Sequence, residues 1–187
     1  MKNILWIFCL SFLLADIQLN WQENGVPIRQ GAHIEWWKSV EAGNDGEVFI
    51  VWSDTRYGVR DIFAQKITIN GEILWGGDGD PTALQDGLLD GIAVVSAPGR
   101  QEDQIIVSDG AGGFYMIWTD YRDEPDKGDI YAQHVYNDGS IQFDLAGIAL
   151  SNQPEEQLGA NLCIDNLGGA FAIWIDGSDI RGTHLSF

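Results

Sequence analysis

Hydrophobic residues along this chain fall into short runs separated by turns rich in glycine, aspartate and asparagine. The clearest set comprises residues 104–109, 114–118 and 129–136, followed by a tight turn at 137–139 and a short run at 140–143. Asp-Gly between apolar runs is a strong hairpin signal, because a two-residue type I′ turn needs positive φ at both central positions. This pattern predicts a meander of four antiparallel strands.

The same pattern occurs three times, and every copy carries a common polar phrase. Trp-x-Asp-x-Arg closes the second run, and Asp-Ile-aromatic-Ala-Gln opens the third. The repeated residues are Trp52, Asp54, Arg56, Asp61 and Gln65, then Trp118, Asp120, Arg122, Asp129 and Gln133, and finally Trp174, Asp176 and Asp179 in a shortened copy. The tryptophans lie 66 and 56 residues apart, a length typical of one supersecondary unit in a repeat fold.

Repeated four-stranded meanders are the blades of a β-propeller. The sequence therefore predicts an all-β chain of antiparallel four-stranded blades, forming an incomplete β-propeller domain at 16–187. We expect an outer strand at 16–25, blades at 26–79 and 80–147, and a partial blade at 148–187. The first blade is expected to close on a strand at 72–75, and a connection at 86–100 carries about a dozen extra residues. Remaining blades are expected from the same chain or from other copies.

Residues 1–15 have the pattern of a secretory signal peptide. Lys2 precedes an uncharged apolar run at 4–14, which is far shorter than the roughly 20 residues that span a bilayer. The protein is therefore expected to be secreted or at the cell surface, with the periplasm as transit or alternative, and free of the membrane after cleavage. Removal of the peptide leaves one cysteine, Cys163, which is predicted to be a small buried apolar residue without a disulfide.

The formal charge of −18 comes from 28 acidic and 10 basic residues. Such a surface repels phosphate groups, so nucleic acid and anionic lipid are excluded as partners. Short acidic turns at 44–46, 78–80 and 109–110 make calcium the one candidate cofactor. Because aspartate and asparagine are also the ordinary residues of hairpin turns, no metal or cofactor site is assigned.

The recurrence of Asp54, Arg56 and Asp61 in successive copies indicates a structural role, because catalytic groups are usually contributed asymmetrically. An arginine fork that bridges both carboxylates would fix the loop between the second and third strands. His134 and His184 are expected at a solvent-facing position, and no catalytic residue is assigned. Trp36 and its neighbour at 37 lie outside the phrase; they either stack on sugar rings or, as we favour, belong to the blade core.

The phrase W-x-D-x-R followed by D-I-[FY]-A-Q resembles repeats in large exported bacterial proteins with propeller domains. Many of those proteins end in a sorting domain of the type IX secretion route, so the resemblance implies export and membership of a larger protein. The architecture is also distantly similar to sialidase-type propellers. The Asp-box pattern S-x-D-x-G-x-T-W of that family is absent from this sequence, which argues against a sialidase.

Three functions remain open at this stage. The leading hypothesis is a non-enzymatic exported propeller module, part of a larger protein, that acts in surface attachment or in glycan or protein binding. It predicts an aromatic or apolar patch on one loop face. The alternative is a fragment of a propeller glycosidase or lyase with catalytic residues partly in missing blades, which predicts an asymmetric cluster of acids and arginines at the central axis. The third is a scaffold that spaces other domains.

Overall fold

The computed structural model describes residues 25–29, 35–75 and 91–186. Its strands are β1 (Glu35–Ala42), β2 (Glu47–Asp54), β3 (Asp61–Thr68), β4 (Ile92–Val95), β5 (Gln101–Ser108), β6 (Phe114–Glu124), β7 (Lys127–Val135), β8 (Ile148–Ser151), β9 (Gln157–Ile164), β10 (Gly169–Asp176) and β11 (Asp179–Ser186). The expected signal peptide at 1–15 and nearly all of the outer strand expected at 16–25 lie outside these residues. Within them, no helix is long and apolar enough to cross a membrane.

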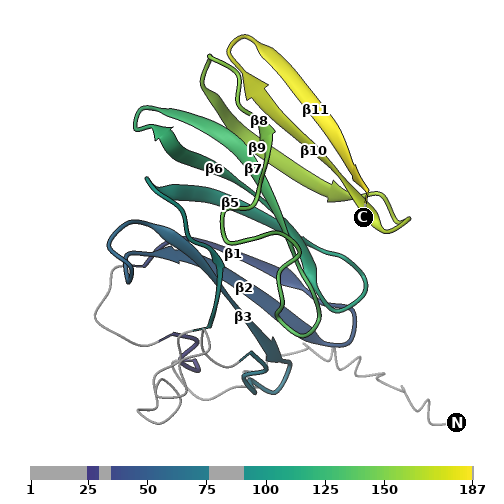
Figure 1. Cartoon of the computed structure of the whole chain (residues 1–187). Coiled ribbons are helices and arrows are strands. Elements are labelled where there is room, and N and C mark those ends of the chain that lie inside the picture. The colour runs from purple at the N-terminus through teal and green to yellow at the C-terminus, as the bar shows by residue number, and fades with distance from the viewer. Residues whose placement is uncertain (1–24, 30–34, 76–90, 187) are drawn as a thin grey trace, which may run out of the picture.

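The strands form three antiparallel sheets that follow one another along the chain. The orders are β1-β2-β3-β4, then β5-β6-β7-β8, then β9-β10-β11. The sheets stack face to face like successive blades, with β1, β5 and β9 as neighbouring inner strands (Figure 1). The predicted fold class is confirmed: the chain is all-β and its antiparallel four-stranded sheets are blades of a partial propeller.

The two ends of each sheet carry different connections. At one end, here named the loop end, lie the β2–β3, β6–β7 and β10–β11 loops and the segments that lead from β4 to β5 and from β8 to β9. At the other, the turn end, lie the β1–β2, β5–β6 and β9–β10 turns. The loop end faces left and upwards in Figure 1, and the turn end faces right.

The outer strand of each four-stranded sheet lies later in the chain than the sequence predicted. Residues 72–75 and 140–143 form only one isolated bridge each to the third strand, and β4 and β8 take the outer places. In the first sheet, Trp75 turns inward and stacks on Phe49, with ring centroids 5.8 Å apart, instead of continuing the ladder. The first two blades therefore end with β4 and β8, beyond the expected limits of 79 and 147.

Gly91 and Gly147 hold equivalent places immediately before β4 and β8. Both have positive φ, +67° and +65°, and a Cβ would lie 2.6 Å from the repeat tryptophan ring at Gly91 and 2.3 Å from it at Gly147. Only glycine fits this backbone and this contact without strain. The equivalence places the extra residues of the first copy within 76–90, outside the described residues, rather than at 86–100, where β4 runs.

Apolar side chains fill the spaces between adjacent sheets. The core between the first and second sheets contains Phe49, Val51, Ile62, Ala64, Trp75, Val94, Val95, Ile106, Phe114, Met116, Trp118, Tyr131 and Val135. The core between the second and third contains Tyr115, Ile117, Ile130, Ala132, Ala160, Leu162, Ala170, Ala172, Trp174 and Leu185. Each sheet thus buries one face against each neighbouring sheet, as expected of blades that cannot form a core alone.

Cys163 is exposed, so the burial predicted from its strand-like sequence is wrong. It lies on β9 directly opposite Phe171 of β10, on the face that points away from the second sheet. No further sheet covers this face within the described part of the chain, and Phe171 itself is 50% exposed. A strand pattern predicts which residues share a face, but it does not say whether that face has a neighbour.

Candidate functional site

Each copy of the polar phrase forms one compact unit at the loop end. In the second copy, the indole N–H of Trp118 donates to Asp120 at 2.8 Å, and Arg122 donates to both oxygens of the same carboxylate at 2.9 and 2.6 Å. The Arg122 guanidinium lies over the ring of Tyr131, 3.9 Å from its centroid, and also donates to the carbonyl of Ala146. The unit ties the β6–β7 loop to the strands beside it.

The first copy has the same geometry. Trp52 donates to Asp54 at 3.0 Å, and Arg56 donates to it at 2.6 Å and lies over Phe63. Burial opposes ionisation of Asp54, but the hydrogen bonds from Arg56 and Trp52 outweigh it and hold its pKa below the usual value. The fork thus closes on one carboxylate rather than bridging two, because neither oxygen of Asp61 accepts a hydrogen bond.

Asp61 and its counterpart Asp129 are instead carboxyl groups that resist ionisation. Burial raises the pKa of Asp61 to about 6; the Ser96 hydroxyl and the Ala97 amide face it without full hydrogen-bond geometry and counter only part of the effect. At Asp129, burial followed by the neighbouring acids raises the pKa above its usual value. Asp61 is fully buried, whereas Asp129 is half-buried.

The third copy obtains its arginine from a different position. Ser178 stands where the loop arginine would be, and Arg181 replaces the aromatic residue of the phrase and pairs with Asp176. Arg181 is 55% exposed, Asp179 lies exposed beside it, and the Trp174 indole N–H has no hydrogen-bond partner. This exchange was not predicted from the sequence, although an arginine at the aromatic position was the visible signal.

The repeated glutamines anchor the segment that follows the third strand. The side-chain oxygen of Gln65 accepts the backbone N–H of Trp75 at 3.1 Å, and that of Gln133 accepts the N–H of Phe143 at 3.0 Å. Both side chains are 1% exposed. The polar contacts of these repeated residues are therefore internal to their blades, and a binding site has to be sought among residues that differ between copies.

Three such residues share one register position at the loop end of the inner strands. Trp36 of β1 is opposite Ser53, Glu102 of β5 is opposite Thr119, and Leu158 of β9 is opposite Ile175. These positions are equivalent in the repeat, since each partner lies one residue after the repeat tryptophan. We call Trp36, Glu102 and Leu158 the inner-strand row. It presents an aromatic, an acidic and an aliphatic side chain on neighbouring strands.

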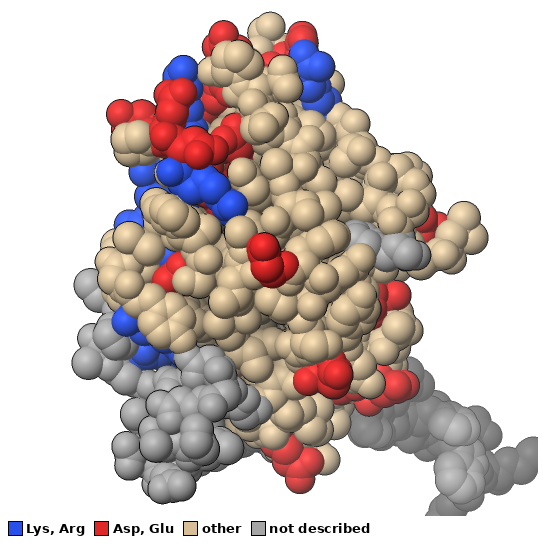
Figure 2. Space-filling model, viewed as in Figure 1, with Lys and Arg blue, Asp and Glu red and all other residues tan. Residues whose placement is uncertain are grey.

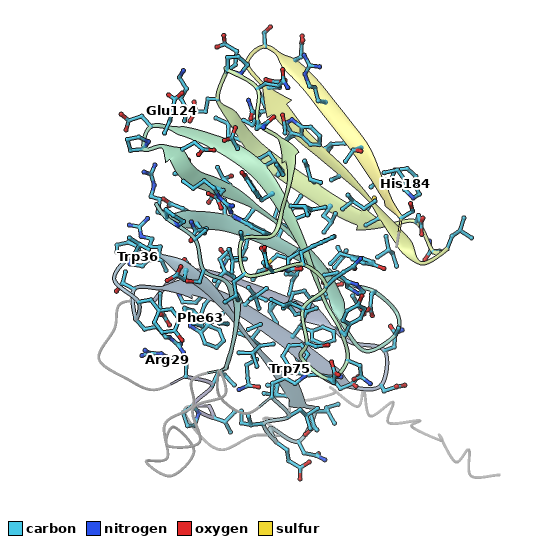
Figure 3. The ribbon with its side chains drawn as sticks, in the orientation of Figure 1. Arg29, Trp36, Phe63, Trp75, Glu124 and His184 are labelled. Atoms are coloured by element: carbon cyan, nitrogen blue, oxygen red, sulfur yellow. The ribbon has the colours of Figure 1, made fainter. Side chains whose placement is uncertain are left out.

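Two arginines fix the acid of this row. Arg60 pairs with Glu102 at 2.9 Å, and Arg100 pairs with the other oxygen of the same carboxylate. The Arg60 guanidinium also lies over Trp36, 4.4 Å from the ring centroid, and that of Arg100 lies 3.6 Å from the centroid of Tyr121. Trp36 remains 40% exposed, so the ring that was expected in the core stands partly in solvent, at the left of Figure 3. Arg60 links it to the Glu102 carboxylate.

A backbone bulge follows the row on the inner strands. Asp103 has φ of +54° and Gly159, at the equivalent position, has φ of +63°. A groove of about 300 Å³ lies here, and its lining includes Lys38, Asp103, Gln104 and Gly159. Positive φ in a residue other than glycine is strained, and such strain concentrates at functional sites. Burial, together with the nearby charge of Glu102, raises the pKa of Asp103.

Basic side chains gather at this end of the molecule. Figure 2 shows Lys and Arg along the left and upper edges of the view, interleaved with acidic residues. The described basic residues of the loop end are Arg29, Lys38, Arg56, Arg60, Arg100, Arg122, Lys127 and Arg181. Among described residues only Lys66 lies toward the turn end. Nearly all described basic residues of this strongly acidic chain therefore lie at the loop end, where they are interleaved with acidic side chains.

A second repeated arrangement, called here the turn-end device, lies at the turn end: a carboxylate pairs with a lysine or histidine on the third strand of each sheet. The pairs are Lys66 with Glu47 at 3.1 Å, His134 with Asp109 at 2.9 Å, and His184 with Asp165 at 2.7 Å. His134 is 5% exposed, so its expected solvent-facing position is wrong. It packs between the rings of Tyr115 and Tyr136, 4.4 and 4.6 Å away.

The carboxylate of this device changes its place in the sequence between copies. In the second copy Asp109 begins the turn and Gly113 ends it, whereas in the first copy Gly43 begins the turn and Glu47 ends it. A Cβ on Gly113 would lie 2.7 Å from Asp109, and a Cβ on Gly43 would lie 3.0 Å from Glu47. Each turn therefore has room for one carboxylate, supplied from either side.

The acidic turns considered for calcium form hairpins in the described chain. At 109–113, one Asp109 oxygen accepts the backbone N–H of Ala111 and that of Gly113, while the other faces His134. Residues 78–80 lie outside the described residues. Elsewhere in 25–29, 35–75 and 91–186, no three His, Cys, Asp or Glu side chains gather closely enough to hold a metal ion.

No family model matches this sequence, and no curated protein matches it. Among solved structures, an endo-arabinase from Bacteroides thetaiotaomicron VPI-5482 is similar, with a TM-score of 0.45 and 12% identity. The match covers 87% of this chain and 59% of that enzyme. This chain therefore spans a little over half the length of that protein, and no activity is carried over at this level of similarity.

Proposed function

We propose that this chain is an exported, non-enzymatic module that binds a glycan at the loop end of its inner strands. The observation that carries the proposal is Trp36, a partly exposed indole held by Arg60 next to the clamped carboxylate of Glu102. A sugar ring has an apolar face that stacks on an aromatic ring, and hydroxyls that bond to fixed polar groups. Aromatic surface with a few placed polar side chains is the usual composition of a small-molecule site.

The neighbouring groove extends this surface. Lys38 and Asp103 line it a short way along the inner strands, and they offer a donor and an acceptor to further hydroxyls. The acid and the arginines are already paired with each other, so the site is close to charge balance. A neutral glycan therefore fits better than a strongly anionic one.

The test is retention of the protein in native gels that contain neutral polysaccharides. We expect Trp36→Ala to lose retention, and Tyr136→Ala to keep it, because Tyr136 is a comparably exposed aromatic residue near the turn end. Near-ultraviolet circular dichroism checks that both variants are folded. Retention of Trp36→Ala equal to that of the wild type would contradict the proposal.

A glycosidase or lyase is the second candidate, favoured by the acid–arginine cluster at the inner strands. Glu102 is fixed by two arginines, whereas burial raises the pKa of its neighbour Asp103. Two carboxyl groups with different environments are what an acid–base pair needs. Release of reducing sugar that disappears in both Glu102→Gln and Asp103→Asn would favour this candidate. Binding without release favours the module.

A further inference from the structure

The third sheet has an open apolar face. Phe171 and Ile173 of β10 are 50% and 51% exposed. The residues at the same repeat positions in the first sheet are Phe49 and Val51, and both are fully buried against the second sheet. We call the exposed side of β9–β11, with Phe171, Ile173 and Ile175, the trailing face. In the earlier blades this face receives the following sheet.

The first sheet has a complementary open face. Val40 of β1 is 67% exposed, whereas its repeat counterparts Ile106 and Leu162 are 4% and 6% exposed because they pack on the preceding sheet. Val48 and Ile50 of β2 are half-buried. We call the side that carries these three valine and isoleucine residues the leading face. Leading and trailing faces meet at both sheet–sheet contacts within the described chain.

The third sheet also has an open edge. β11 pairs with β10, and no fourth strand follows it within the described residues. Residues 25–29 match the missing element: Gly25 has φ of +83°, as Gly147 before β8 has φ of +65°, and Val-Pro-Ile-Arg follows it as Ile-Ala-Leu-Ser follows Gly147. Residues 25–29 lie in no described strand, and proline is tolerated in an outermost strand.

These complementary parts lie at opposite ends of the stack of sheets. Arg29 lies beside the first sheet, with its Nε 3.7 Å from Asp54, and Figure 3 places it far from the β10–β11 sheet. Figure 1 shows the first and third sheets separated by the second. One copy of the arrangement therefore cannot bring its own residues 25–29 to β11.

We propose that a second copy of this chain docks head to tail on the first. Its residues 25–29 add an outer strand to β11, and its leading face covers the trailing face, as the second sheet covers the first. If the trailing face of the second copy also receives the leading face of the first, the two head-to-tail contacts are related by a two-fold axis and close the dimer into a ring. The described residues of two copies then supply six sheets, within the four to eight of typical propellers, and the edge of β11 is covered in both copies.

The register of the existing outer strands specifies the new contact. Phe63 is opposite Ala93, and Tyr131 is opposite Ala149. The equivalent pair is Arg181 of one copy and Pro27 of the other. Opposed residues in antiparallel strands have Cα atoms about 4.5–5.5 Å apart, which a disulfide can bridge.

Oxidation of the chain carrying Pro27→Cys and Arg181→Cys, in a background with both Cys9→Ser and Cys163→Ser, tests this register. We expect a covalent dimer on a non-reducing gel. The control pairs Pro27→Cys with Ser186→Cys, five residues away on β11, and should stay monomeric. A monomeric product of the first variant, or equal cross-linking in both, would overturn the proposal.

Light scattering of the unmodified chain tests whether the leading face of one copy packs on the trailing face of another. We expect twice the monomer mass, and a return to the monomer mass in Phe171→Glu, which places a charge on the trailing face. Leu167→Glu is the control, since Leu167 is 92% exposed in the β9–β10 turn and should leave the dimer intact. A monomeric wild type, a dimer that survives Phe171→Glu, or an open series of larger oligomers would overturn the closed ring.

Discussion

Trp36 and Glu102 occupy the same register position on neighbouring inner strands, and Arg60 contacts both. The repeat therefore places an aromatic residue and an acid at equivalent positions of neighbouring sheets. Because Arg60 joins the two, the orientation of the indole and that of the carboxylate are coupled.

Removal of Arg60 is expected to weaken glycan binding. Arg60→Ala deletes a charge-assisted hydrogen bond to Glu102 and the contact with Trp36. Such bonds contribute about 1.5–3 kcal/mol to folding, and without this one neither the indole nor the carboxylate is held in place for the glycan. Arg60→Lys should rescue poorly, because an ammonium group lacks the planar fork. Titration by affinity electrophoresis measures both, and full rescue by lysine would contradict the coupling.

The repeat tryptophan is expected to dominate stability. Trp118 has no exposed surface, so Trp118→Ala should lower the free energy of unfolding by about 3–5 kcal/mol or abolish folding. Trp36→Ala, at a 40% exposed position, should have a much smaller effect. Urea denaturation compares them; a Trp118→Ala protein as stable as the wild type would disprove the structural role of the phrase.

The buried ion pair between Asp120 and Arg122 should stabilise the fold more than the exposed ion pair between Asp176 and Arg181. Asp120→Asn removes the fully buried negative charge that pairs with Arg122, and breaking a buried ion pair typically costs about 3–5 kcal/mol. Asp176→Asn should cost less, because Arg181 is 55% exposed and water replaces the lost contact. Equal urea midpoints for the two variants would show that burial does not determine how much each ion pair contributes to stability.

Asp61 should make the chain less stable at neutral than at mildly acidic pH. Its folded-state pKa of about 6 lies above the unfolded value near 3.9. Between these values the folded state binds more protons, so the contribution of Asp61 to stability falls as pH rises from about 4 to 6. Asp61→Asn should therefore gain stability relative to the wild type across this interval.

Urea midpoints of the wild type and Asp61→Asn at several pH values between 4 and 7 measure that difference. Taking the difference matters, because Asp54 and Asp109 have lowered pKa values and lose stability at acid pH in both proteins. A constant difference between the two proteins would show that Asp61 does not titrate in this range.

The fold was largely predictable because it depends on repeated local signals. Apolar runs and Asp-Gly turns predicted the meanders, and tryptophan spacing predicted three copies. The outer strands were misplaced because residues 72–75 have the composition of a strand, although the inward turn of Trp75 onto Phe49 breaks the ladder. That turn is a tertiary contact, which periodicity does not report.

The candidate site was harder to predict because it consists of residues that differ between the three copies of the repeat. Trp36 was noticed, but its relation to Glu102 depends on inner-strand register, which the bulge at Asp103 disturbs. Counting sixteen residues back from each repeat tryptophan finds Trp36, Glu102 and Leu158. Arg60 and Arg100 reach the site from separate connections, and their convergence follows only from the stacking of sheets.

The exchange of glycine and carboxylate across the turn bears on how the copies diverged. Converting the arrangement of Asp109 and Gly113 into that of Gly43 and Glu47 takes two changes. If the glycine is replaced by the acid first, two like charges crowd into a turn with space for one. If the original acid is lost first, the base on the third strand has no carboxylate to pair with. Because each single change destabilises the turn, we expect the two positions of a turn to change together in evolution rather than one at a time.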